Sequence, residues 1–135
     1  MYDFEKRLYA DPHQDLNSLW WRLVGKYQLL SKPEPGANPD WAAKIHFSAA
    51  PCYYHNYLLG ELLASQFDSY IRHNILSCND RDGVNLVGCK EVGGFFQEFV
   101  FKAGKYYHWR RMIERATGQS ITAEYFVSQF IVNKS

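Results

Sequence analysis

The sequence contains only three cysteines, and no two of them form a C-x-x-C pair. An odd number of scattered thiols argues against a disulfide framework and against a structural zinc site. Cys78 and Cys89 flank a loop and could pair in an oxidising compartment. We expect buried or idle thiols instead, at these two positions and at Cys52.

The histidine spacing of a zinc protease is also missing, because its H-E-x-x-H motif places two ligands one helical turn apart. The five histidines are His13, His46, His55, His73 and His108. No two of them are four residues apart, so we expect no metal site built wholly within this chain. The sequence contains no G-x-S-x-G elbow, phosphate-binding glycine-rich loop or nucleotide fingerprint. Cys52 near His55 lacks the other groups of a thiol protease, and we interpret their proximity as chance.

Neither charge nor hydropathy indicates nucleic acid or a lipid bilayer as a partner. The 15 basic and 14 acidic residues leave a net charge of +1, which gives no field to attract a polyanion. No apolar run reaches the length of about 18 residues that a membrane span requires. The first ten residues are charged and amphipathic. We therefore predict no nucleic-acid binding, no transmembrane span and no signal peptide within this chain.

Aromatic residues, in contrast, are abundant, at 17% of the sequence. Aromatic side chains bury large areas, and their polar tips need partners. An amphipathic interior or a broad buried interface is therefore expected. A chain of 135 residues is long enough for one core, and we predict a single domain over residues 1–135.

Apolar residues recur at helical spacing along most of the chain. Helices are predicted over residues 2–10, 13–30, a short stretch from Trp41, Cys52 to about Asn74, 88–102, 106–116 and 123–132. Asp11-Pro12 is the expected start of the second helix, Asp40 the expected cap of the third and Thr122 the expected cap of the last. Residues 31–40 and 77–83 are predicted loops. The first helix places Phe4 and Leu8 on one side and Glu5 on the other, polar side. Since no stretch shows convincing strand alternation, the predicted fold class is all-α with six or seven helices.

The segment Trp41–Gln66 carries the candidate site, because its first seventeen residues hold one lysine, two histidines, three tyrosines and one cysteine. Lys44 and His46 are two apart, so both can point to one side of a strand-like or irregular segment. Tyr54 and Tyr57 are three apart and share a helix face.

These side chains suit a carboxylate and a carbonyl as ligands. Lysine supplies a charge for a carboxylate, while tyrosine and histidine supply hydrogen-bond donors. A donor aimed at a developing oxyanion lowers the barrier to acyl transfer. The alternative is that the tyrosines are core residues and that Lys44 is solvated.

Three runs resemble the angiotensin-converting-enzyme family of zinc peptidyl-dipeptidases, especially its bacterial members. The runs are DPHQDLNSLWWRLVGKYQ, PDWAAKIHFSAAPCYYHNYLLGELLASQ and GGFFQEFVFKAGKYYHWRRMIERATGQSITAEYFVSQF. They cover nearly the whole chain, and the K-x-H and Y-x-x-Y elements are their most specific features. More distantly, Y-x-x-Y-L is similar to thimet-oligopeptidase-like metallopeptidases.

The resemblance implies a role for each residue of the cluster. Lys44 and Tyr54 would hold the C-terminal carboxylate of a peptide. His46 would hydrogen-bond a carbonyl near the scissile bond, and Tyr57 would donate to the oxyanion. The His46-to-Tyr54 spacing is one residue longer than the family's, which makes Tyr53 a rival for the role of Tyr54. Asn56 stands where vertebrate members carry a chloride-binding arginine, so chloride activation is not expected.

The resemblance also implies that zinc is bound elsewhere. The family's zinc ligands are H-E-x-x-H and a downstream glutamate, and this chain has no such motif. We therefore expect a C-terminal fragment of a larger, mostly helical metallopeptidase, which is inactive without its missing N-terminal part. Peptide would be the substrate of the intact enzyme, and bacterial relatives are often exported, to the periplasm or outside the cell. The alternative is a free-standing helical interaction domain that forms homo-oligomers through an exposed former interface.

Overall fold

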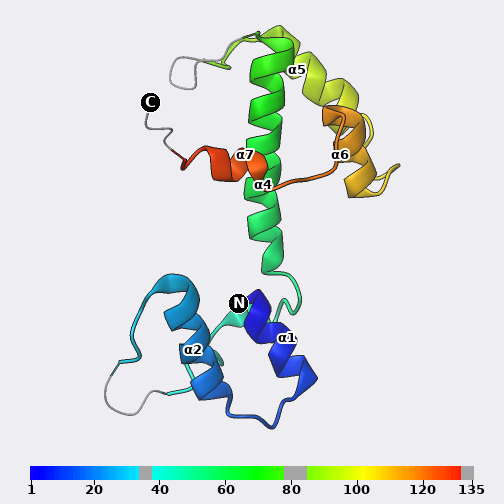
Figure 1. Cartoon of the computed structure of the whole chain (residues 1–135). Helices are drawn as coiled ribbons and strands as arrows, with labels where there is room; N and C mark the ends of the chain where they lie inside the picture. Colours follow the sequence, from blue (N-terminus) through cyan, green and yellow to red (C-terminus); the bar gives the residue numbers. More distant parts are fainter. Residues whose placement is uncertain (34–37, 78–84, 132–135) are drawn as a thin grey trace. The chain divides into compact units, whose positions relative to one another are not determined.

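The computed structural model describes residues 1–33, 38–77 and 85–131 of the chain. In these residues the regular structure is entirely helical, with seven α-helices, two π-helical segments and no strand (Figure 1). The predicted all-α class is therefore confirmed. Within the same three ranges, no helix is both long enough and apolar enough to cross a bilayer.

The helical elements of the described residues occur in the following order along the chain. The α-helices are α1 (Tyr2–Ala10), α2 (Leu16–Gln28), α3 (Ile45–Ser48), α4 (His55–Tyr70), α5 (Lys90–Phe95), α6 (Trp109–Thr117) and α7 (Glu124–Ser128). The π-helical segments are η1 (Ile71–Ile75), which continues α4, and η2 (Phe96–Phe101), which continues α5. In both segments a backbone N–H bonds the carbonyl five residues earlier, from Leu76 to Ile71 and from Lys102 to Gln97.

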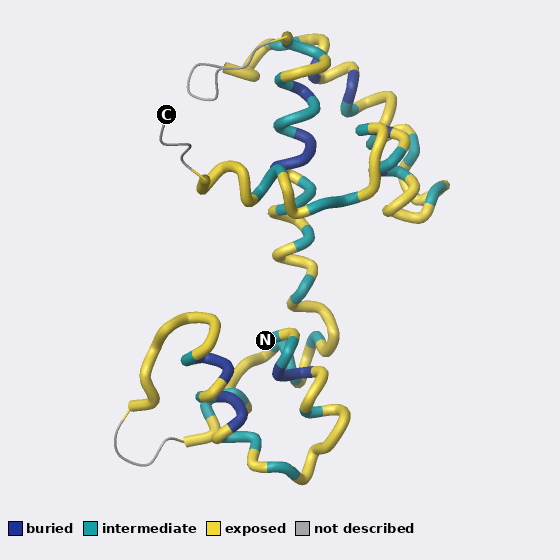
Figure 2. Tube along the Cα trace, viewed as in Figure 1, coloured by how far each residue is buried: buried dark blue, intermediate teal, exposed yellow. Residues whose placement is uncertain are grey.

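Backbone contacts divide the chain within α4 into two compact units, Met1–Leu58 and Leu59–Ser135, called unit 1 and unit 2 below. Each unit has its own buried hydrophobic cluster (Figure 2). The single domain expected over residues 1–135 stays a prediction, and each unit is described by itself.

The core of unit 1 is an aromatic cluster around Phe4, whose side chain is fully buried. Its ring lies 5.2 Å from the Trp20 ring, 5.5 Å from Trp41 and 5.2 Å from Phe47. These rings come from α2, from the turn before α3 and from α3. Aromatic pairs at this separation attract beyond the area that they bury. A single side chain of α1 therefore joins the segments that carry the candidate site.

The core of unit 2 forms where α4 and η1 pack against α5 and α6. Phe67, Ile71 and Phe95 are buried there, and the Tyr70 ring stacks on Phe95 at 5.3 Å. Gln66 is also buried, with 1% of its surface exposed.

The buried amide of Gln66 is fully hydrogen-bonded. Its Nε2 donates to the Thr117 hydroxyl at 2.9 Å, and its Oε1 accepts from the Thr122 backbone N–H at 3.2 Å. Buried polar groups are stable when they are paired in this way. The side chain thus connects the end of α6 and the segment after it to the second half of α4.

The predicted start of the second helix is wrong by three residues. Asp11 does not cap this helix; it ends α1, and its Oδ1 accepts a hydrogen bond from the His13 N–H. Asp15 is the N-cap instead, because its two carboxylate oxygens accept from the N–H and the hydroxyl of Ser18 at 3.0 and 2.6 Å. The helix ends at Gln28, since Leu29 has a φ of 58°.

Two later helix starts are also corrected. Residues 40–43 form turns rather than a helix capped by Asp40, and α3 begins at Ile45 with Lys44 as its N-cap. Helix α4 begins at His55 rather than at Cys52, because Cys52 has a φ of 57°, outside the helical region.

The C-terminal helices are shorter than predicted. Helix α6 begins at Trp109 instead of residue 106 and ends before Gly118, whose φ is 81°. The Thr122 hydroxyl accepts from the Glu124 N–H at 3.3 Å, so it does bond the start of α7. Cys78, most of the predicted loop 77–83 and Val132 lie outside the described residues. Cys52 and Cys89 are free thiols.

Replacing Phe4 by alanine tests the aromatic core of unit 1. We expect Phe4→Ala to lower the free energy of unfolding by about 3–5 kcal/mol, the usual cost of deleting a buried aromatic ring. Urea denaturation followed by far-UV circular dichroism measures this loss. Leu29→Ala is the matched control because Leu29 is 87% exposed, and we expect a change within about 0.5 kcal/mol. Equal losses in the two variants would contradict the assignment of the core.

Candidate functional site

The candidate site lies in unit 1, where α3 meets the start of α4. Four aromatic side chains gather there, one from α3 and three from residues 53–57. His46 is the second residue of α3, Tyr53 and Tyr54 directly precede α4, and Tyr57 lies in the first turn of α4. We call these four residues the ring cluster.

His46 contacts both tyrosines of the Y-x-x-Y element. Its ring centroid lies 4.8 Å from that of Tyr54 and 6.0 Å from that of Tyr57, both nearly perpendicular. The Tyr54 and Tyr57 rings are 5.2 Å apart, and the Tyr53 ring lies 6.0 Å from Tyr57. Edge-to-face and tilted pairs at these distances are the favoured arrangements of aromatic rings. The structure therefore brings together four of the five residues that the sequence singled out.

The tyrosines of the ring cluster are open to solvent. Tyr53 is 51% exposed, Tyr54 38% and Tyr57 57%. The core around Phe4 is built from other side chains, so these tyrosines are not the core residues of the alternative reading. Their phenol groups and the His46 imidazole can serve as hydrogen-bond donors to an oxygen ligand.

Lys44 lies at the edge of this group. As the N-cap of α3 it has extended backbone angles, φ −82° and ψ 108°, and its side chain is exposed. Lys44 and His46 could share one side on a strand-like or irregular segment, but the chain is helical from Ile45. Successive residues of a helix turn by roughly 100°, so side chains two apart do not share a face. The ring contacts that join His46, Tyr53, Tyr54 and Tyr57 in the described part of the chain do not involve Lys44.

The backbone before α4 fixes the directions of the tyrosines. The Tyr53 carbonyl accepts from the Asn56 N–H at 2.9 Å, and the Tyr54 carbonyl accepts from the Tyr57 N–H at 3.3 Å. These two tight turns start the helix. His55, between the tyrosines, is half-buried and turns the other way, with its ring 5.8 Å from that of Tyr2 in α1. Neighbouring residues of this turn thus face α3 and α1.

The ring cluster does not offer the ligands that zinc requires. Protein zinc sites use at least three histidine, cysteine or carboxylate ligands, and His46 is the one such residue among the four rings. In the described ranges, no three residues of these types gather where they could hold a metal ion. The chemistry that the ring cluster can perform is binding through hydrogen bonds and stabilising negative charge on oxygen.

Sequence reasoning missed Glu5, which it placed on the polar side of the first helix. The structure buries this carboxylate to 5% exposure, whereas the neighbouring Lys6 and Arg7 are exposed. No local pattern marks Glu5 as different from these neighbours. Its partner is the backbone N–H of Cys52, 47 residues later, which no local pattern could indicate.

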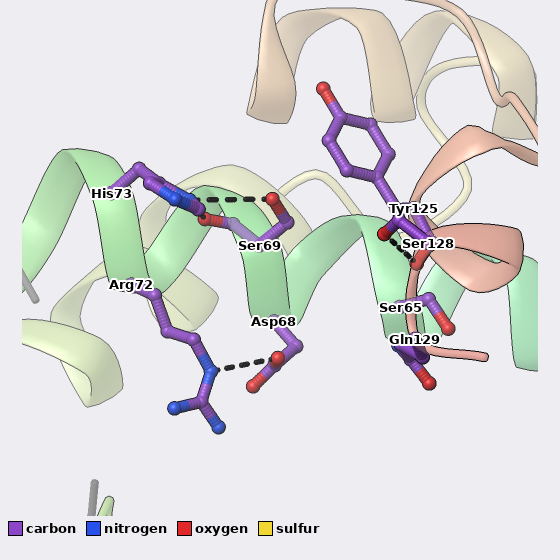
Figure 3. A pocket seen from close by; sticks show the side chains of 8 residues that line it. All are labelled: Ser65, Asp68, Ser69, Arg72, His73, Tyr125, Ser128 and Gln129. Carbon is purple, nitrogen blue, oxygen red and sulfur yellow. Dashed lines mark hydrogen bonds and ion pairs between the residues drawn. The ribbon is translucent and has the colours of Figure 1, made fainter. Parts of the chain in front are cut away.

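A polar pocket of about 180 Å³ lies in unit 2, lined by side chains of α4, η1 and the end of the chain around α7 (Figure 3). Its polar groups bond one another: Arg72 Nε donates to Asp68 Oδ2 at 2.8 Å, and His73 Nδ1 lies 2.7 Å from the Ser69 carbonyl. The residues predicted from the sequence are absent from its lining. The ring cluster therefore remains the candidate site.

Comparison with known proteins adds no relative. No protein-family model, curated protein or solved structure matches this chain. The likeness to peptidyl-dipeptidases therefore depends on the sequence runs quoted above, and the function of the ring cluster has to be argued from its residues.

The exposure of Tyr57 predicts a small effect on stability. We expect Tyr57→Ala to lower the free energy of unfolding by less than about 2 kcal/mol, because the loss is limited to ring contacts at a partly exposed position. The measurement is urea denaturation, with Phe4→Ala as the buried reference. A loss as large as that of Phe4→Ala would mean that Tyr57 is a core residue after all.

Proposed function

We propose that this chain is the substrate-binding part of a zinc-dependent peptidyl-dipeptidase, which releases dipeptides from the C-terminal end of peptides. The observation that supports the proposal most is the contact of the His46 ring with Tyr54 and Tyr57 in an open cluster. The resemblance gives these same three residues roles around one peptide bond. They lie close enough together for a single short peptide to reach all three.

In this proposal the ring cluster acts on the carbonyl being attacked. The Tyr57 hydroxyl donates a hydrogen bond to the oxyanion of the tetrahedral intermediate, and His46 donates to a backbone carbonyl beside the scissile bond. Such donors are worth most in a site that excludes water. Because Tyr57 is 57% exposed in this chain, the intact enzyme would have to cover it.

The C-terminal carboxylate of the peptide would bind Lys44 and Tyr54. Lysine acts as a point charge on a flexible stem, so the exposed side chain of Lys44 can reach past the rings. Both tyrosines contact Tyr57, but Tyr54 also contacts the His46 ring, and we assign the carboxylate role to Tyr54 for this reason. Asn56 carries no charge, and chloride activation is not part of the proposal.

Zinc and its ligands would come from a segment outside this chain that carries H-E-x-x-H and a further glutamate. This chain alone would bind part of the peptide without hydrolysing it. The parent enzyme would act in the bacterial periplasm or outside the cell, as exported relatives of the resembling family do.

A second candidate function is a helical interaction domain that associates with itself. The observation that favours it is a set of exposed apolar side chains in unit 2, in which Phe101 is 69% exposed and Tyr106 84%. Exposed apolar patches mark surfaces that bind other proteins. Light scattering at high concentration tests this function, and a strict monomer would contradict it.

The coding sequence distinguishes the two candidates. An in-frame H-E-x-x-H upstream of this chain is expected for the peptidase and is not required by the interaction domain. Zinc bound by the isolated chain, measured by atomic absorption after dialysis, would contradict both.

The oxyanion role of Tyr57 predicts a kinetic effect in the enzyme that includes the zinc-bearing segment. We expect Tyr57→Phe to lower kcat for dipeptide release by roughly 100-fold or more, the usual value of such a donor. Tyr106→Phe, at an exposed tyrosine outside the ring cluster, is the matched control and should leave kcat within about threefold of the unchanged enzyme. A kcat for Tyr57→Phe in that same range would exclude the oxyanion role.

The charge of Lys44 predicts a selective effect on binding. We expect Lys44→Gln to raise KM for peptides with a free C-terminal carboxylate by about tenfold or more, the value of a hydrogen bond to a charged group. Peptides with an amidated C-terminus should be affected much less. Lys32→Gln, at another exposed lysine of unit 1, is the control. If Lys44→Gln changes KM equally for both kinds of peptide, Lys44 does not bind the carboxylate.

A further inference from the structure

Glu5 is a buried carboxylate with a specific partner. Its Oε1 accepts a hydrogen bond from the Cys52 backbone N–H at 2.6 Å. A buried charge without a partner is costly, and a hydrogen bond between a carboxylate and a backbone N–H is about twice as strong as a neutral one. The bond therefore fixes one backbone position just before the tyrosines of the ring cluster.

Cys52 itself has an unusual backbone conformation. Its φ of 57° lies in the left-handed region, which is unfavourable for a residue with a side chain. Such a conformation persists only where the surrounding structure holds it. The hydrogen bond to Glu5 stabilises this conformation. Tyr53 and Tyr54 follow Cys52 directly, so the turn at Cys52 sets the direction of the chain at these two tyrosines.

Helix α1 supports the ring cluster at further points. Three of its side chains contact residues next to the cluster: Tyr2 with His55, Phe4 with Phe47, and Glu5 with Cys52. His55 follows Tyr54, Phe47 follows His46, and Cys52 precedes Tyr53. Helix α1 thus touches both segments of the cluster through the neighbours of its members.

Tyr9 lies beside the same bond. Desolvation, and then the nearby Cys52 thiol and Glu5 carboxylate, raise the pKa of the Tyr9 phenol. A phenol is already protonated at neutral pH at its ordinary pKa, and this shift moves its ionisation further from neutral pH.

We infer that Glu5 is a positioning residue, whose carboxylate holds the turn at Cys52 and thereby sets Tyr53, Tyr54 and Tyr57 against His46. The importance of this positioning for catalysis rests on the proposed function. The contacts between the rings do not depend on that function. Structure and activity can therefore be tested separately.

The structural test uses nuclear Overhauser effects between aromatic protons in the 135-residue chain. We expect Glu5→Ala to remove the nuclear Overhauser effects between the His46 and Tyr54 rings. The nuclear Overhauser effects between the Phe4 and Trp20 rings should remain. Glu5→Gln keeps an acceptor oxygen at the same reach and should preserve both sets. Asp3→Ala, which removes a carboxylate of α1 that bonds Arg7 and Tyr27, is the matched control and should also preserve both.

The kinetic test uses the enzyme with its zinc-bearing segment. Glu5→Ala should lower kcat by roughly 10- to 100-fold, because small misplacements of catalytic groups have effects of this size. Glu5→Gln should restore most of the activity and Asp3→Ala should retain it. A general loss of stability would instead lower kcat in Asp3→Ala as well. If no enzyme of this set releases dipeptides, the proposed function fails, and the structural test still decides the role of Glu5.

A different variant applies if Glu5→Ala does not fold. Glu5→Asp keeps the charge but shortens the side chain by one methylene group, so its carboxylate no longer reaches the Cys52 N–H. We expect it to lose the effects between His46 and Tyr54 as well. Persistence of those effects in the folded Glu5→Ala or Glu5→Asp variant would overturn the inference.

Discussion

The Phe4 ring is surrounded by aromatic rings from three other segments of unit 1, and those segments are short. Helix α3 has four residues, too few to be stable by hydrogen bonds alone. It keeps its place because Phe47 packs on Phe4 on one side, while His46, the residue before Phe47, faces the tyrosines. The position of the candidate site therefore depends on the packing of aromatic rings around the buried Phe4 side chain of α1.

Sequence periodicity was sufficient to predict the class of the fold and several of its elements. Helix α1 has the predicted bounds because Phe4 and Leu8 lie one turn apart and the polar residues fall between them. Helix starts were less predictable, since Asp11-Pro12 and Asp15 are both good starting signals. The structure uses Asp15, whose carboxylate bonds both the N–H and the hydroxyl of Ser18. Choosing between two local signals requires knowledge of what each helix packs against.

The candidate site was predictable where it depended on local spacing. Tyr54 and Tyr57 share a face because they are three apart on a helical turn, and His46 meets them. The direction of Lys44 was not predictable, because it depends on whether residues 44–46 are extended or helical. The left-handed backbone conformation at Cys52 was even less predictable from the sequence. Positive φ angles are expected at glycine or asparagine, and the group that stabilises this one comes from a distant helix.

The two π-helical segments have a consequence for the length of the chain. A π-helical turn closes its hydrogen bond over five residues instead of four, so η1 and η2 each contain one residue more than an α-helix needs to span the same turn. The loss of one residue from either segment would restore an ordinary α-helix and would leave the flanking turns in register. Single-residue insertions and deletions in evolution are therefore easiest to absorb at Ile71–Ile75 and Phe96–Phe101, where gaps are expected when related sequences are aligned.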